Sequence, residues 1–228
     1  MTIRRKTLLI ITILLFTAGL FPAFSAVAKK TAFEPDLTKL KEGKDYKVYN
    51  RSLSHFIDGA RKGIRFDEGR DVGLVRFAGY EFTNGVIEFD VRGKNVLQKS
   101  FVGIAFHGID EQTYDAIYFR PFNFRSDDPV RYSHAVQYIS SPDYSWQKLR
   151  NEHPGVYEQP IQSPPDPDTW FHVRIIVESP NVSVFVNGAK EPSLMVKKLN
   201  NNAKGWIGLW VGDESGGDFA NLKVVSAQ

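Results

Sequence analysis

The chain has 228 residues, no cysteine and a formal net charge of +3, part of which comes from Arg4, Arg5 and Lys6 at its start. The lack of cysteine excludes a disulfide scaffold, and the near-neutral charge of the remainder gives no support to nucleic-acid binding. The glycine-rich, HExxH and paired CxxC patterns of nucleotide and metal sites are also missing from the sequence.

The first 28 residues have the three parts of an export signal. The basic start is followed by an apolar run, Leu8 to Leu20, and then by the small-residue sequence Ala26-Val27-Ala28. This order predicts a cleaved signal and a mature protein that starts near Lys29, in the periplasm or outside the cell. The alternative is a single membrane anchor, although the run is short for a span and Pro22 follows it.

Residues 29–50 are expected to form an irregular lead-in, and residues 51–228 a single domain with one sizeable core. Short apolar or alternating runs recur in the domain, separated by glycine, asparagine, proline and aspartate. This spacing, without a long segment of helical period, predicts an all-β sandwich. The expected strands are Ile64–Phe66, Leu74–Phe77, Gly85–Val91, Phe101–His107, Ala116–Phe122, His134–Ser140, Trp170–Val177, Val182–Val186, Trp206–Val211 and Leu222–Val225.

Alternation along these runs predicts which side chains face the core, because successive strand residues point to opposite faces. Glu88 and Asp90 are expected on the outer face of their run. His107, Tyr118 and Arg120 are expected together on the outer face of the two following runs. The next run, HAVQYIS, has apolar residues at both parities, so its orientation stays open.

The segment from Tyr114 to Glu158 mixes aromatic rings, arginines, histidines, carboxylates and amides more densely than a plain sandwich strand requires. It contains two expected strands and most of a long linker, Pro142 to Asp168, and such linkers are usually functional or mobile. Aromatic rings can cover the apolar faces of a sugar, while arginine and carboxylate groups hydrogen-bond its hydroxyls. The composition therefore predicts a saccharide site with these strands as its floor and the linker as its wall.

Two phrases in the C-terminal third carry a family resemblance, TWFHVRIIVESPNVSVFVNG and GWIGLWVGDESGGDFANLKV. Together with NGVIEFDVRG, they resemble strands of the concanavalin A-like lectin/glucanase superfamily, and most closely its laminin G-like and 3-keto-disaccharide hydrolase branch. The resemblance spans Gly73 to Val225. It implies a two-sheet antiparallel jelly-roll sandwich, with one curved sheet that binds or cleaves carbohydrate on its concave face.

The resemblance also implies that outward side chains of the inner strands and residues of the long loops contact the sugar. Some lectin-like members bind calcium near the sheet edge, and Asp213 and Asp218 lie in a glycine-rich turn that suits such an ion. A solvated acidic turn is the alternative, and no other cofactor is expected. The expected substrate-binding residues are Glu88, Asp90, Tyr118, Asn123, Gln137, Trp146 and Arg150.

Whether the domain is an enzyme stays open. The laminarinase-type pattern needs a further glutamate after Glu88-Phe89-Asp90, and the chain has Arg92 and Gly93 there, which disfavours cleavage by paired carboxylates. Cleavage of a 3-keto-glycoside needs only a base and a group that stabilises developing negative charge. The candidate catalytic residues for that reaction are Glu158, His107 and Arg120, with His134 as a further candidate base.

Three functional interpretations follow from the sequence. The first is saccharide binding, the second is keto-glycoside cleavage, and the third is a non-catalytic scaffold at the cell surface. The expected partner is a carbohydrate, and neither nucleic acid nor stable membrane insertion after signal cleavage is expected.

Overall fold

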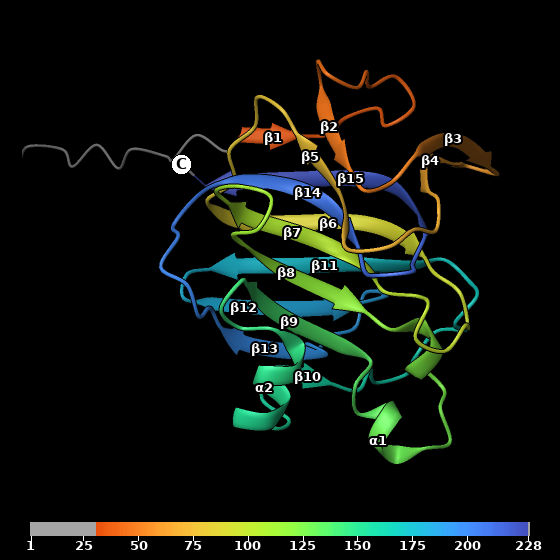
Figure 1. Cartoon of the computed structure of the whole chain (residues 1–228), viewed down its shortest axis with the longest axis vertical. Coiled ribbons are helices and arrows are strands. Elements are labelled where there is room, and N and C mark those ends of the chain that lie inside the picture. The colour runs from red at the N-terminus through yellow and green to blue at the C-terminus, as the bar shows by residue number, and fades with distance from the viewer. Residues whose placement is uncertain (1–30, 228) are drawn as a thin grey trace, which may run out of the picture.

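The computed structural model describes residues 31–227, which form two antiparallel β-sheets packed against each other (Figure 1). The predicted export signal, residues 1–28, lies outside the described residues. Within the described part, no helix is long and apolar enough to cross a membrane. The all-β sandwich predicted from the spacing of apolar runs is confirmed.

One sheet has eight strands and the other has seven. The eight-stranded sheet consists of β1 (Thr31–Phe33), β3 (Leu53–Asp58), β4 (Arg61–Phe66), β6 (Asn84–Arg92), β11 (Phe171–Glu178), β12 (Asn181–Val186), β13 (Leu194–Lys197) and β15 (Gly217–Ala227). Its order is β13-β12-β11-β6-β15-β4-β3, and β1 pairs with β15.

The seven-stranded sheet consists of β2 (Tyr46–Tyr49), β5 (Gly73–Phe77), β7 (Val102–Gly108), β8 (Tyr114–Phe119), β9 (Val136–Ser141), β10 (Glu158–Gln159) and β14 (Trp206–Val211). Its order is β10-β9-β8-β7-β14-β5-β2. The connections between β8 and β10 contain η1 (Pro121–Asn123), α1 (Pro129–Tyr132) and α2 (Trp146–Glu152).

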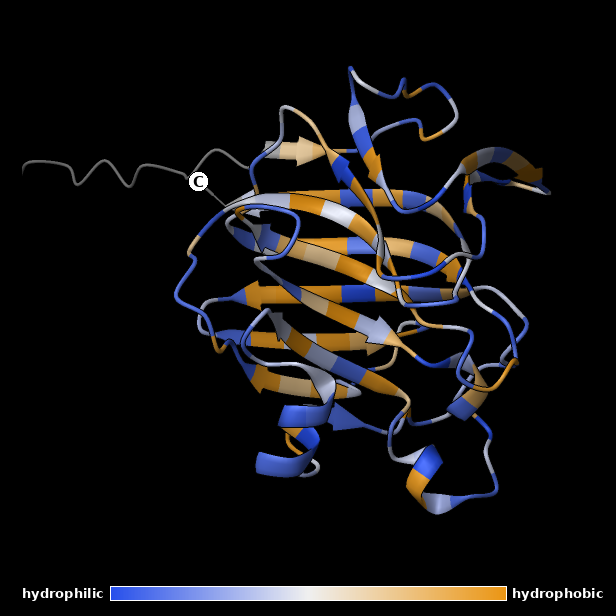
Figure 2. Ribbon diagram, viewed as in Figure 1, coloured by the Kyte–Doolittle hydropathy of each residue, from blue (hydrophilic) through white to orange (hydrophobic). Residues whose placement is uncertain are grey.

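Alternate apolar side chains from both sheets fill the space between them. In β6 the inward residues are Ile87, Phe89 and Val91, and β8 contributes Ile117 and Phe119, all fully buried. Figure 2 shows this apolar character along the strands, whereas many of the connecting segments are hydrophilic. The inward faces predicted by alternation are therefore confirmed for these strands.

The lead-in expected at residues 29–50 is not irregular throughout. It contributes β1, which pairs with β15, and β2, which pairs with β5 at the edge of the seven-stranded sheet. Strand β3, at the far edge of the other sheet, was also not expected. Its side chains are mostly exposed, so it lacks the alternation of apolar residues by which strands are recognised.

His107 departs from the alternation of β7. The pairing of β7 with β14 shifts between Trp206 and Gly208, so that Phe106 and His107 together oppose one residue. This β-bulge, with a φ of +52° at His107, turns the imidazole inward, where it is fully buried. The prediction that His107 lies on the outer face beside Tyr118 and Arg120 is wrong, because a bulge reverses the parity that the sequence alone implies.

The inward His107 belongs to a buried polar network that ties the β13–β14 connection to the seven-stranded sheet. Its Nε2 lies 2.7 Å from the carbonyl oxygen of Thr83, and its Nδ1 accepts a hydrogen bond from Lys198 Nζ at 2.6 Å. Lys198 Nζ also lies 3.1 Å from Asp115 Oδ2, while Asp115 Oδ1 accepts from the Tyr138 hydroxyl at 2.6 Å. Because an ammonium can only donate, the imidazole is neutral and carries its proton on Nε2.

We expect this network to make stability fall in mildly acidic solution. Burial lowers the pKa of His107 from its ordinary value of 6.5, and the Lys198 ammonium acts in the same direction. The unfolded chain then binds a proton at this histidine more readily than the folded chain does. The stability that neutral His107 contributes is therefore complete above pH 6.5, and it is lost as the pH falls toward the lower pKa of the folded state. Melting temperatures measured from pH 7.5 to pH 5 should fall, and His107→Gln should flatten this dependence. The same substitution at exposed His55 is the control, and equal slopes for the two variants would contradict the assignment.

Candidate functional site

The outer face of the seven-stranded sheet carries a second cluster of buried apolar and aromatic side chains, separate from the core between the sheets. Tyr118 stacks on Trp210 with 4.8 Å between ring centroids and 28° between ring planes. Trp210 Nε1 donates a hydrogen bond to the Tyr114 hydroxyl at 3.2 Å. Aromatic packing of this kind on the outside of a sandwich is not needed to hold the two sheets together, which marks this face as a candidate binding surface.

Helix α2 forms a wall beside this face, next to β9 and β10 (Figure 1). Ser145 caps the helix by accepting a hydrogen bond from the amide of Lys148 at 3.3 Å, and Leu149 anchors it in the core. Trp146 and Arg150 lie one turn apart, with the guanidinium 4.8 Å from the indole ring. Trp146 is 40% exposed, so its ring is available to a ligand.

Two adjoining pockets lie between the sheet and this wall. The first, here the aromatic pocket, has a volume of about 250 Å³, and its rings are Phe101, Tyr114, Tyr118, Tyr144, Trp146 and Trp210. The second, here the polar pocket, has a volume of about 600 Å³, and its polar residues include Arg120, Asn123, Arg131, His134, Gln147 and Arg150. Phe101, Trp146 and Asp213 line both pockets, so the two adjoin, and together they are here called the groove.

Arg120 lies at the base of the polar pocket and is 5% exposed. Its Nη1 donates to the carbonyl of His134 at 3.0 Å, and its Nη2 donates to the Tyr118 hydroxyl at 2.7 Å and to Gln137 Oε1. The Tyr118 hydroxyl donates in turn to Gln137 Oε1 at 3.0 Å. Burial lowers the pKa of Arg120, but a guanidinium still carries its charge at neutral pH. The floor of the groove therefore holds a fixed buried cation.

Glu158 supplies the carboxylate nearest to this cation. Arg150 binds it through two hydrogen bonds, of 2.7 Å to Oε1 and 2.6 Å to Oε2, and Arg120 Nη1 lies 3.7 Å from Oε2. His134 Nε2 lies 3.2 Å from Oε1. One carboxylate that is 3% exposed therefore serves two guanidinium groups and an imidazole.

His134 is the titratable base that lines the polar pocket. Burial lowers its pKa, and Arg150 and Arg120 act in the same direction, whereas Glu158 opposes them. The ring is therefore neutral at pH 7, and its Nε2 lies beside the Glu158 carboxylate. Its Nδ1 makes no hydrogen bond to any residue that the structure describes, and the residue lines the polar pocket.

Comparisons with solved structures support the fold. A carbohydrate-binding module, CBM66 from Bacillus subtilis, superposes with a TM-score of 0.57 and 12% identity, over 79% of this chain and 95% of that one. A Bacillus subtilis protein of unknown function with a galectin-like fold has a TM-score of 0.56 and 14% identity, and the match covers 88% of this chain and 100% of that one. A glycoside hydrolase family 16 endo-glucanase from Bacteroides ovatus has a TM-score of 0.55 and 10% identity, and the match covers 85% of this chain and 99% of that one.

The chain has a concanavalin A-like jelly-roll fold. No family model matches the sequence, and no curated protein matches it either. Because these structures share so few residues with the chain, the likeness extends to the jelly-roll fold alone. The chemistry of the groove depends on the residues of this chain.

Most residues that the sequence singled out meet in the groove of this jelly roll. Asn123 Nδ2 donates to the His134 carbonyl at 3.1 Å, beside the contact that Arg120 makes to the same oxygen. What these residues do there stays a prediction. The predicted residues brought together in or directly beneath the groove are Tyr118, Arg120, Asn123, Gln137, Trp146, Arg150 and Glu158.

The sequence analysis did not place Tyr114, Arg131 or Trp210 in the site. Tyr114 could have been found from parity, because it lies four residues before Tyr118 on the same strand and therefore on the same face. Trp210 packs on the outer face, where it stacks on Tyr118. Arg131 sits in a linker without strand periodicity, so no sequence signal gave its direction.

Two predicted substrate-binding residues lie elsewhere. Glu88 and Asp90 are on β6, in the eight-stranded sheet, and they face away from the core on the opposite side of the sandwich. Asp90 is occupied there, with Arg61 at 3.0 Å and His172 at 2.9 Å. The prediction that these carboxylates line the same face as Tyr118 is wrong, because alternation separates inside from outside without saying which sheet a strand joins.

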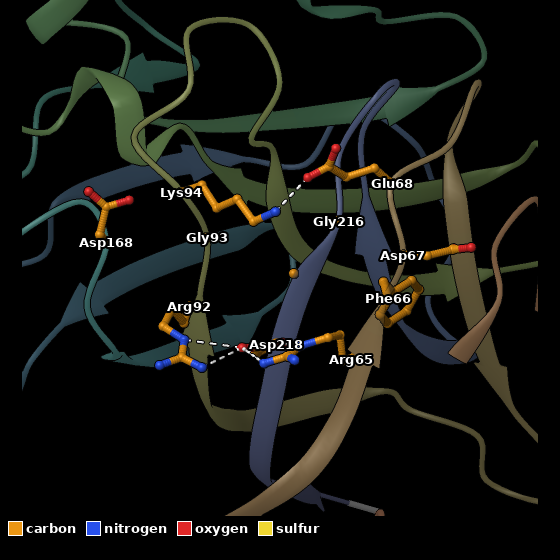
Figure 3. A pocket seen from close by; sticks show the side chains of 11 residues that line it. Arg65, Phe66, Asp67, Glu68, Arg92, Gly93, Lys94, Asp168, Gly216 and Asp218 are labelled. Carbon is orange, nitrogen blue, oxygen red and sulfur yellow. Dashed lines mark hydrogen bonds and ion pairs between the residues drawn. The ribbon is translucent and has the colours of Figure 1, made fainter. Parts of the chain in front are cut away.

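The two aspartates predicted to bind calcium have separate partners. Asp218 is held on the outer face of the eight-stranded sheet by Arg65 at 2.6 Å and Arg92 at 2.7 Å (Figure 3). Burial would raise the pKa of Asp218, but the hydrogen bonds from these arginines outweigh it and lower the pKa. Asp213 accepts the amide of Asp71 at 2.6 Å. In the described part of the chain, no three His, Cys, Asp or Glu residues are grouped to hold a metal ion, and both aspartates already have protein partners.

We therefore expect removal of calcium to leave the protein unchanged. A calcium ion at Asp218 would have to displace at least one arginine from a carboxylate that is only 9% exposed. Melting curves recorded with excess EDTA and with millimolar CaCl₂ should coincide. A higher melting temperature in calcium, abolished by Asp213→Asn, would overturn this expectation.

Proposed function

We propose that the protein binds a saccharide in the groove formed by the aromatic and polar pockets. The observation that carries the proposal is that the two pockets adjoin, with exposed Trp146 and stacked Tyr118 and Trp210 on one side and fixed polar groups on the other. A sugar ring has apolar faces, which favour contact with aromatic rings, and hydroxyls, which need placed donors and acceptors. The groove offers both.

Affinity electrophoresis tests the proposal directly. The protein is run through native gels that contain laminarin, dextran, mannan, polygalacturonate or dextran sulfate, with bovine serum albumin as the reference. Binding is expected to retard the protein in at least one gel, and Trp146→Ala is expected to restore its mobility. Unchanged mobility in every gel, together with no signal on an oligosaccharide array, would refute saccharide binding and favour the scaffold interpretation.

A second candidate function is cleavage of a 3-keto-glycoside, and the contact between His134 and Glu158 favours it. A neutral imidazole oriented through Nε2 leaves Nδ1 as a base that could remove the acidic proton next to a keto group. Arg120 and Arg131 border the same pocket, where negative charge would develop. Glu158, one of the candidate bases named from the sequence, is held by Arg150 and suits an orienting role.

Incubation with 3-keto-trehalose, followed by measurement of released glucose, separates the two candidates. Turnover that is lost in His134→Gln but retained in the control His153→Gln would support the enzyme. Binding of the substrate without release of glucose would leave only the binding function.

Export of the mature protein is part of the proposal and rests on the sequence of residues 1–28. Expression of the full chain in a bacterial host, followed by fractionation and N-terminal sequencing, tests it. A mature terminus near Lys29 in the periplasm or medium is expected. Retention of the intact chain in the membrane fraction would instead indicate the anchor.

A further inference from the structure

We infer that the saccharide carries an anionic group, a carboxylate or a sulfate ester, which binds at Arg131 in the polar pocket. This inference rests on the proposed saccharide binding and names the class of sugar. It comes from the charge balance of the groove, from how Arg131 is held, and from a buried donor that lacks a partner.

The polar pocket has more cationic than anionic groups. Three guanidinium groups line it, those of Arg120, Arg131 and Arg150, and Asp213 is the one carboxylate among its described lining residues. Glu158 adds a second carboxylate from beneath, but Arg150 occupies both of its oxygens. With His134 neutral, the pocket keeps a positive charge that its own residues do not balance.

Arg131 is fixed by neutral acceptors. Its Nε donates to Asn123 Oδ1 at 3.3 Å, and its Nη2 donates to the carbonyl of Phe122 at 2.9 Å. No carboxylate of the described residues lies within ion-pair distance of it. Neighbouring Asp128 uses its side chain to cap α1, where it accepts the amide of Val130 at 2.8 Å. These contacts orient the guanidinium without neutralising it, as recognition of an anion requires.

The floor of the groove also holds a buried cation, Arg120, and a buried donor without a partner among the described residues, Gln137 Nε2. The charge of Arg120 is largely removed from water, and its nearest carboxylate, that of Glu158, is 3.7 Å away and already bound to Arg150. Buried charges and donors cost free energy unless they are compensated. Gln137 Nε2 is buried and has no partner among the described residues. A negative group in the polar pocket would offset the charge that Arg120 contributes there.

The adjoining aromatic pocket selects among anions. A free inorganic anion would leave the rings of Tyr118, Trp146 and Trp210 unused. A pyranose with an acidic substituent can place its apolar face on Trp146, the exposed ring of the three, while its charged group binds Arg131. Uronic acids and sulfated sugars share this chemistry, and they differ in the geometry and charge of the acidic group.

Matched polymer pairs test the inference. Polygalacturonate is compared with fully methyl-esterified pectin, which keeps the backbone but loses the charge, and dextran sulfate is compared with dextran. In at least one pair, the acidic polymer is expected to bind about tenfold or more tightly than the neutral one, and this difference should shrink at high salt. Preference in the pectin pair would identify a carboxylate, and preference in the dextran pair a sulfate. Arg131→Gln should weaken that binding about tenfold, and Arg131→Lys should recover part of it.

Arg174→Gln is the matched control, because it removes the same charge from the outer face of the other sheet, where Arg174 stacks on Phe185. Equal affinity for neutral and acidic partners would overturn the inference while saccharide binding itself stands. Equal losses in Arg131→Gln and Arg174→Gln would also overturn it, since the attraction would then be a property of the whole surface. No binding to any polymer would overturn both the inference and the proposed function.

Discussion

Glu158→Gln is expected to lower the free energy of unfolding by about 3–5 kcal/mol, the range for removing one partner of a buried ion pair. The substitution keeps the size of the side chain but leaves the buried guanidinium of Arg120 and the more exposed one of Arg150 without their shared carboxylate. For a domain of this size the melting temperature should fall by about 2–4 °C per kcal/mol. Urea denaturation at pH 7 measures the loss.

Glu152→Gln is the control for this prediction, because Glu152 is an exposed residue at the end of α2, and its loss should change stability by less than about 0.5 kcal/mol. A second readout does not depend on stability. Glu158 holds the pKa of His134 up against burial and two arginines, so NMR titration of a folded Glu158→Gln sample should show this pKa moving lower. Equal stabilities for the two variants, with an unmoved His134 titration, would contradict the structure of the site.

Trp146→Ala is expected to weaken saccharide binding about 10–100-fold while lowering stability by no more than about 1 kcal/mol. Trp146 is partly exposed and borders both pockets, so its loss removes a stacking surface for the ligand without opening the core. Affinity electrophoresis gives the dissociation constant, and the melting temperature gives the change in stability.

Trp170 provides a matched control for Trp146, since each indole stacks on an arginine. The guanidinium of Arg92 lies 4.9 Å from the Trp170 ring, on the side of the eight-stranded sheet. Trp170→Ala should therefore leave saccharide affinity unchanged. If both variants bound as tightly as the wild type, the groove would not be the site; if both lost binding, the effect would be an indirect one through the fold.

The sequence was sufficient for the inward faces of most strands and for much of the groove. The alternation around Phe89 and Phe119 predicted the core, and the same rule placed Tyr118 and Arg120 outside it. The prediction of faces succeeds because the alternation of side chains along a strand depends only on neighbouring residues. The linker that carries Trp146 and Glu158 was expected to form the wall, although its helix was not foreseen in a segment so rich in turn residues.

The remaining errors come from information that is not local. Glu88 and Asp90 have the parity of outward residues, but their position depends on the long-range pairing of β6 with β11 and β15. His107 obeys alternation until the bulge opposite β14, which depends on the register of a strand almost a hundred residues away. The surplus charge at Arg131 likewise emerges only when linker, strand and helix are brought together.

The order of strands at the β10 edge of the seven-stranded sheet has a consequence for how this protein could diversify. Strands β8, β9 and β10, with η1, α1 and α2 between them, form one uninterrupted stretch of chain and end the sheet on that side. Only β7 joins this block to the rest of its sheet. Ligand preference can therefore change through substitutions within residues 114–159 while the other strands keep their pairing, as long as core side chains such as Phe119 and Tyr138 are retained.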